Sequence, residues 1–120
     1  MKTAVQFGAG NIGRGFMGQL FWEAGYKTVF VETQERVVRL LNEKGRYPLK
    51  LLDAYSKKEI DLVIDRFEAV DARDVEGVGK AFLNAEVAGT AVGVKNLAGI
   101  APLLAEGIRR RRAERSGPID

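Results

Sequence analysis

Three glycines near the N-terminus have the spacing of a phosphate-binding turn. Gly8, Gly10 and Gly13 form the pattern G-x-G-x-x-G, which alone is a weak match in a chain with 14 glycines among 120 residues. The context makes it informative, because a short apolar run precedes the pattern and a helical pattern follows it. In that setting the glycines allow a sharp turn, the approach of a pyrophosphate and close packing of helix on strand. The turn therefore predicts a dinucleotide site.

An acidic residue ends the next predicted strand, at the distance that a dinucleotide fold requires. Glu32 lies 19 residues after Gly13, and a carboxylate there accepts hydrogen bonds from the ribose hydroxyls. The same carboxylate repels a 2′-phosphate, so NAD is the expected cofactor rather than NADP. The alternative for Glu32 is an ordinary solvated strand end.

Two polar residues near the turn have open roles. Asn11 either caps the following helix or touches the pyrophosphate. Arg14 either contacts a phosphate of cofactor or substrate, or points to solvent. The sequence does not decide between these alternatives.

Specific residues argue against a P-loop, a metal site and the common catalytic sites. The spacing from Gly8 to Gly13 also fits a P-loop, but Arg14 and Gly15 stand where that loop needs Lys and Ser or Thr. The chain has no cysteine and no histidine. This removes thiolate nucleophiles, the commonest metal ligand and the usual general base. No catalytic residue and no metal site are therefore assigned.

The first 45 residues alternate between strand and helix patterns. Buried strands are expected at Thr3–Phe7 and Lys27–Glu32, with amphipathic helices over 12–24 and 34–44. This order is that of a βαβ unit. The first helix carries apolar residues four apart, which predicts a buried stripe of Ile12, Phe16, Leu20 and Ala24.

The remainder is expected to add a strand pair, a helix, a strand and a long final helix. In chain order these cover residues 47–52, 60–64, 75–83, 87–92 and 97–112. The predicted fold class is α/β, a doubly wound, mostly parallel Rossmann sheet in the order 3-2-1-4, with ligand at the carboxyl ends of the strands. Residues 1–120 are expected to form one dinucleotide-binding domain. Its SGPID end at 116–120 resembles a loop entering a further element, so the sheet is expected to stop before its last strands.

Charge and hydropathy limit the expected partners. The net charge is +3, from 19 basic and 16 acidic residues, and no basic face runs through the chain, so nucleic acid is not an expected partner. Arg109–Arg112 and Arg115 are interpreted as solvated residues that complement the end of a helix dipole. No apolar run is long enough for a bilayer and no signal-peptide pattern is present, so no membrane partner and a cytoplasmic location are expected. An exposed edge strand favours self-association.

Two longer stretches resemble the mannitol dehydrogenase family: FGAGNIGRGFMG at 7–18 and TAVGVKNLAGIAPLLAEGI at 90–108. The resemblance covers essentially the whole chain, but only the N-terminal part of the family's architecture. It implies a metal-independent, NAD-dependent oxidoreductase that interconverts mannitol 1-phosphate and fructose 6-phosphate. It implies cofactor contacts from Phe7, Gly8, Ala9, Gly10, Asn11, Ile12, Gly13, Glu32, Val92 and Gly93.

The same resemblance places the catalytic machinery outside these residues. The family's large helical second domain holds a catalytic lysine and the groups that bind the polyol or sugar phosphate. No lysine or arginine here matches that lysine, so no catalytic residue is carried over. The alternative function is a stand-alone nucleotide-sensing or protein-interaction module on the same scaffold, because a fold does not fix a function.

Overall fold

A four-stranded parallel sheet forms the centre of the computed structural model, which describes residues 1–114 and 119. Its strands are β1 (Thr3–Phe7), β2 (Lys27–Glu32), β5 (Phe67–Asp71) and β6 (Ala85–Thr90). They lie in the order β5-β2-β1-β6, with all neighbours parallel. The chain runs outward from β1 and then returns to its other side at β6. The predicted α/β fold is thus confirmed, and the order reverses beside β1. The third position of the predicted order 3-2-1-4 is filled by β5, which the sequence did not predict, and the predicted strand pair lies outside this sheet.

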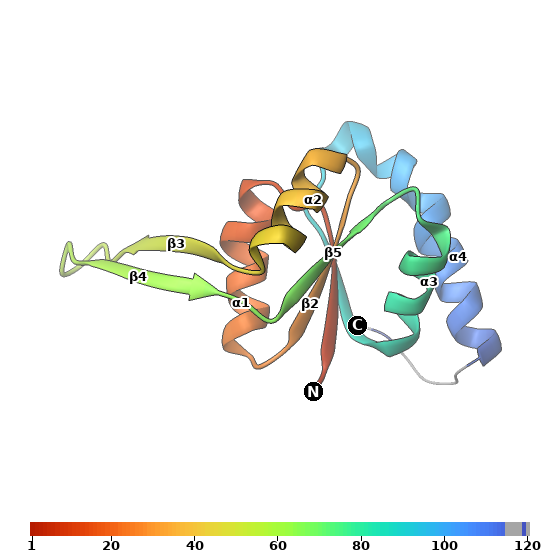
Figure 1. Cartoon of the computed structure of the whole chain (residues 1–120), viewed down its shortest axis with the longest axis horizontal. Coiled ribbons are helices and arrows are strands. Elements are labelled where there is room, and N and C mark those ends of the chain that lie inside the picture. The colour runs from red at the N-terminus through yellow and green to blue at the C-terminus, as the bar shows by residue number, and fades with distance from the viewer. Residues whose placement is uncertain (115–118, 120) are drawn as a thin grey trace.

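Helices cover both faces of the sheet (Figure 1). On one face lie α1 (Gly18–Glu23), preceded by the π-helical turn η1 (Gly13–Met17), and α2 (Glu35–Lys44). On the other face lie α3 (Val75–Asn84) and α4 (Leu97–Glu114), the latter entered through the short 3₁₀ turn η2 (Val94–Asn96). This is the two-sided helical cover of a doubly wound sheet.

The alternation of side chains along the strands divides the core into two layers. Phe7 on β1 packs against Phe82 of α3, with ring centroids 5.9 Å apart. On the opposite face, Phe30 of β2 contacts the rings of Tyr47 and Phe67. Burial of each large apolar side chain stabilises the fold by about 1.5–3 kcal/mol. Both layers anchor strands whose carboxyl ends form the candidate site.

The predicted apolar stripe of the first helix is wrong. Ile12, Phe16 and Leu20 are 65%, 57% and 45% exposed, and Ala24 is exposed as well. The four residues share a side of the helical segment that faces solvent, and the π-helical turn places the buried glycines five residues apart rather than four. The buried positions are instead Gly13, Gly18 and Phe21.

A β-hairpin projects from the body of the molecule (Figure 1). Its strands β3 (Tyr47–Leu52) and β4 (Glu59–Ile64) pair antiparallel, which confirms the predicted strand pair. Tyr47 and Ile64 at its base are buried in the core, whereas Tyr55 near its tip is fully exposed. The hairpin therefore depends on its base for attachment to the sheet domain.

The edges and ends of the sheet leave two expectations untested. Within residues 1–114 and 119, β6 pairs only with β1, so its outer edge is open and self-association stays a prediction. The SGPID end lies outside the described residues, apart from Ile119. No helix in the described part of the chain has the length and apolarity to cross a membrane.

The C-terminal arginines have unequal environments. Arg111 is only 3% exposed, and its guanidinium donates to the carbonyls of Phe82, at 2.6 Å, and Ala85, at 2.7 Å, at the end of α3. The prediction that the cluster is solvated is therefore wrong for Arg111. It holds for Arg109 and Arg112, whereas Arg110 is half-buried and pairs with Glu76 and Glu114. Arg115 lies outside the described residues.

An Arg111→Met variant is expected to unfold about 2 kcal/mol more easily, because the carbonyls at the end of α3 lose a charged donor inside the protein. Arg112→Met is the matched control, since Arg112 is exposed on the same helix, and its effect should stay within about 0.5 kcal/mol. Urea unfolding of both variants measures the difference. Equal midpoints would show that Arg111 does not stabilise α3.

Candidate functional site

The glycine turn sits directly beyond the carboxyl end of β1. Gly8 has φ +95°, a conformation that favours glycine, and its N–H donates to the Val31 carbonyl at 2.9 Å. A Cβ atom on Gly13 would overlap the Gly8 carbonyl oxygen, whereas a Cβ on Gly10 would have no protein atom within 4 Å. The first and third glycines are therefore required by the fold itself. The space at Gly10 is open for a ligand.

Glu32 joins the glycine turn to the end of β2. Its carboxylate accepts hydrogen bonds from the Ala9 N–H at 3.0 Å and from the Gln34 N–H at 2.7 Å. The Thr33 hydroxyl donates to the same group at 3.3 Å. Glu32 is only 8% exposed, so it is not a solvated strand end. The carboxylate is held at the edge of the sheet, next to the turn.

Most of the other expected site residues gather at the same edge. Phe7 and Ala9 are buried, whereas Asn11 and Ile12 are exposed. Beyond β6, a Val92 side-chain methyl lies 3.2 Å from the position of a Cβ on Gly8, and Gly93 follows it. Asn11 lies inside the first helical turn rather than before it, since the Arg14 N–H donates to the Gly10 carbonyl at 2.9 Å. The structure therefore brings together the ends of β1, β2 and β6 around the turn.

A second acidic residue, Asp71, stands beside Glu32. The two are register partners at the ends of β5 and β2. Hydrogen bonds from Arg73 lower the pKa of Asp71 to about 2, and Arg73 also pairs with Glu35 at 3.5 Å. The charge of Asp71 is thus already neutralised by a cation. Glu32 has no such ion pair within residues 1–114 and 119.

Comparison with known proteins assigns the family. The family model for the mannitol dehydrogenase Rossmann domain matches residues 2–120. The chain belongs to the mannitol dehydrogenase family. Because the match covers the glycine turn, Glu32 and the segment after β6, it includes every residue of the candidate site.

Several relatives of this mannitol dehydrogenase domain are mannitol-1-phosphate 5-dehydrogenases. That of Lacticaseibacillus paracasei is 41% identical over 114 residues, which cover 94% of this chain and 29% of the relative. That of Oceanobacillus iheyensis is 34% identical over 121 residues, 100% of this chain and 31% of the relative. That of Brevibacillus brevis is 38% identical over 117 residues, 98% of this chain and 30% of the relative. The chain therefore spans about three-tenths of these relatives.

A Rossmann domain of the mannitol dehydrogenase family implies a nucleotide cofactor, and the residues at the turn fit one. The backbone at Gly10 is open to a pyrophosphate, and Glu32 supplies carboxylate oxygens where a ribose is expected. A cluster of three or more His, Cys, Asp or Glu residues able to hold a metal ion does not occur among residues 1–114 and 119. The open backbone at Gly10 and the acceptor oxygens of Glu32 therefore match a dinucleotide.

One residue that supports the site, Tyr47, is not among the residues predicted from sequence. Its phenol donates to the Arg14 carbonyl at 2.7 Å, inside the π-helical turn that follows the glycines. Gly18 makes room for it, because a Cβ there would overlap the phenol oxygen. A glycine in a helix interior often marks such close packing. Gly18 was thus the available signal, although it did not identify its partner.

A Tyr47→Phe variant is expected to lose about 1 kcal/mol of stability, because the Arg14 carbonyl loses a donor. Burial raises the pKa of Tyr47 to about 12, while the charge of Arg14 opposes this rise, and the ordinary value is 10.0. The neutral phenol therefore stabilises the fold fully below pH 10, and this contribution is lost as the pH rises toward 12. Urea unfolding should show a steeper loss between these pH values for the wild type than for the variant. Parallel curves would contradict the assignment.

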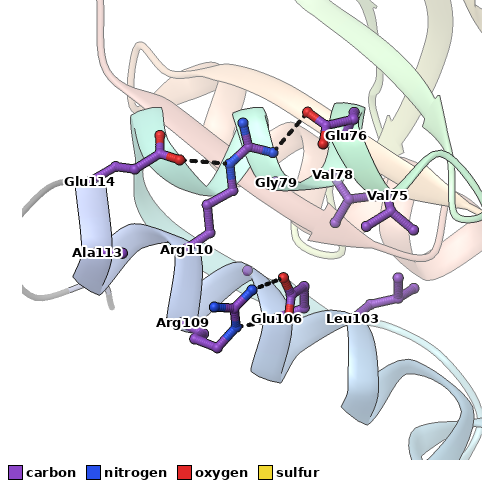
Figure 2. A pocket seen from close by; sticks show the side chains of 11 residues that line it. Val75, Glu76, Val78, Gly79, Leu103, Glu106, Arg109, Arg110, Ala113 and Glu114 are labelled. Carbon is purple, nitrogen blue, oxygen red and sulfur yellow. Dashed lines mark hydrogen bonds and ion pairs between the residues drawn. The ribbon is translucent and has the colours of Figure 1, made fainter.

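A separate hollow of about 310 Å³ lies between α3 and α4 (Figure 2). Its charged side chains already pair with one another: Arg110 with Glu76 at 3.1 Å and with Glu114 at 3.3 Å, and Arg109 with Glu106. The hollow is thus a packing seam between two helices. It contains none of the predicted site residues.

Proposed function

We propose that this chain is the NAD-binding domain of a cytoplasmic dehydrogenase that interconverts mannitol 1-phosphate and fructose 6-phosphate. The observation that carries the proposal is the hydrogen bond from the Ala9 N–H to the Glu32 carboxylate, 3.0 Å long. This bond ties the pyrophosphate turn to the acid expected to bind ribose. The names of the relatives supply mannitol 1-phosphate and its oxidation at carbon 5, and the ketone formed by that oxidation is fructose 6-phosphate.

The residues of the chain have distinct roles in this proposal. Gly8 and Gly13 shape the turn, and Gly10 leaves space for the pyrophosphate. Glu32 accepts hydrogen bonds from the ribose and repels a 2′-phosphate, which favours NAD over NADP. Val92 and Gly93 lie beside the cofactor from the β6 side. When bound, NAD supplies hydride transfer to and from the sugar carbon.

The substrate-binding and proton-transfer groups are proposed to belong to a second, helical domain outside residues 1–120. The chain spans about three-tenths of its relatives, and no catalytic residue is assigned within it. The 120-residue protein should therefore show no NADH production from mannitol 1-phosphate and NAD, followed by absorbance. Turnover by the pure protein would contradict this division of roles.

The second candidate function is a nucleotide-sensing or protein-interaction module that uses the same scaffold without chemistry. The reading frame of the gene distinguishes this module from the dehydrogenase domain. Continuation past Asp120 into a helical domain supports the dehydrogenase. A stop codon after Asp120, together with inactivity of the natural protein, supports the module.

A further inference from the structure

A hollow of about 320 Å³ lies beside the glycine turn, between η1, α2 and the base of the β3–β4 hairpin. We call it the Arg14 hollow, after the residue that it shares with the turn region. Its volume falls at the lower end of the range for small-molecule sites. Six of the residues that line it matter here: Arg14, Lys44, Arg46, Val37, Leu40 and Pro48.

The Arg14 hollow carries positive charge without compensation. Its lining includes three cationic side chains, Arg14, Lys44 and Arg46, and no aspartate or glutamate. None of the three forms an ion pair with another residue in the part of the chain that the structure describes. The α3–α4 hollow differs in this respect, because carboxylates there already hold the arginines (Figure 2). Several unpaired cations around one hollow create a local potential that attracts anions.

Arg14 provides an independent observation. Its Nε atom is shielded from solvent, and it has no hydrogen-bond acceptor among residues 1–114 and 119. A buried donor without an acceptor is costly, and such groups are rare in folded proteins. Arg14 also lines a neighbouring hollow of about 470 Å³, together with Asn11 and Gly15. A guanidinium that is partly stripped of water interacts strongly with an anion that reaches it.

We propose that the Arg14 hollow binds a phosphate monoester at a site separate from the dinucleotide. A phosphate dianion matches a group of three cations, and arginine and lysine are the usual ligands for phosphate. The apolar side chains of Val37, Leu40 and Pro48 offer a surface for the organic part of the monoester. This site goes beyond the proposed function, because NAD binding at the glycine turn does not require it.

Inorganic phosphate is the first probe, added at constant ionic strength to the 120-residue protein with ¹⁵N labelling. The Arg14 Nε–H is shielded from solvent, so its proton exchanges slowly and its NMR signal can be followed as an anion approaches the guanidinium. We expect that signal to shift and saturate at millimolar phosphate, and to do so equally when NADH is present in excess. Displacement of phosphate by NADH would place it at the glycine turn instead. That result, or the absence of saturation, would overturn the proposal.

Fructose 6-phosphate and AMP then distinguish a sugar phosphate from a nucleotide as the source of the phosphate. At least one of the two should bind more tightly than inorganic phosphate, and the tighter one gives the source. Free fructose should leave the Arg14 signal unchanged. If neither monoester binds more tightly than inorganic phosphate, the apolar surface has no role and the monoester site is refuted.

Charge-removing variants locate the site. Lys44→Gln and Arg46→Gln should each weaken phosphate binding about tenfold, since each removes a charge-assisted contact. Arg39→Gln is the matched control, because Arg39 is exposed on the same helix as Lys44 and does not line the hollow. NADH affinity should be unchanged in all three variants, which separates this proposal from the proposed function. An equal loss of phosphate binding in all three would indicate only nonspecific attraction to net charge and would refute the site.

Discussion

A Gly13→Ala variant is expected to lose at least about 3 kcal/mol of stability, the upper part of the range for overpacking a core. The added Cβ would overlap the Gly8 carbonyl oxygen, which is backbone and cannot rotate away as a side chain would. Either the π-helical turn or the end of β1 must shift to accommodate it. For a domain of this size the melting temperature should fall by roughly 10 °C or more.

Gly10→Ala is the matched control for this substitution. It adds the same methyl group three residues earlier in the same turn, but there it meets no protein atom within 4 Å. Its melting temperature should stay close to that of the wild type. Equal losses in the two variants would show that glycine is needed throughout the turn for backbone freedom alone, and that the contact between Gly13 and Gly8 is not decisive.

Glu32→Gln is expected to weaken NADH binding by about 10- to 100-fold. An amide has one acceptor oxygen, so it cannot satisfy the N–H groups of both Ala9 and Gln34 as the carboxylate does. It also loses the charge-assisted hydrogen bonds to ribose, each of about 1.5–3 kcal/mol. Because the repulsion of a 2′-phosphate disappears, the preference for NADH over NADPH should narrow as well. Fluorescence titration with both nucleotides measures the two effects.

Glu35→Gln is the control for Glu32→Gln. Glu35 is exposed at the start of α2 and pairs only with exposed Arg73 among the described residues. Its replacement removes the same charge near the same edge of the sheet, and NADH affinity should change less than about twofold. A similar loss of affinity in both variants would show that general electrostatics, rather than a ribose contact, accounts for the effect.

The strands and helices near the site were predictable because their signals are local. The run Thr3–Phe7, the glycine spacing and the acid at Glu32 each depend on a few neighbouring residues, and the structure places them as expected. Strand β5 (Phe67–Asp71) was not predicted. Exposed Glu68 interrupts its short apolar pattern, so its pairing with β2 is what defines it. The residues of the segment alone do not indicate pairing with a strand that is distant in the sequence.

The errors at the first helix have the same origin. The spacing of Ile12, Phe16 and Leu20 groups them on one side of the helix but does not show whether the rest of the fold covers that side, and the structure leaves it exposed. The π-helical turn packs against Tyr47, which lies 33 residues beyond Arg14 in the sequence. The burial of Arg111 likewise depends on carbonyls at the end of α3. These features depend on tertiary contacts that no local pattern contains.

Calorimetric titration of the 120-residue protein with NADH tests the central claim most directly. The geometry of the glycine turn predicts one NADH per chain for the wild type. It predicts much weaker binding for Gly10→Ala, because the added methyl fills the open space while leaving the fold intact. No heat at millimolar NADH, or equal binding by wild type and Gly10→Ala, would contradict the assignment of this turn as a cofactor site.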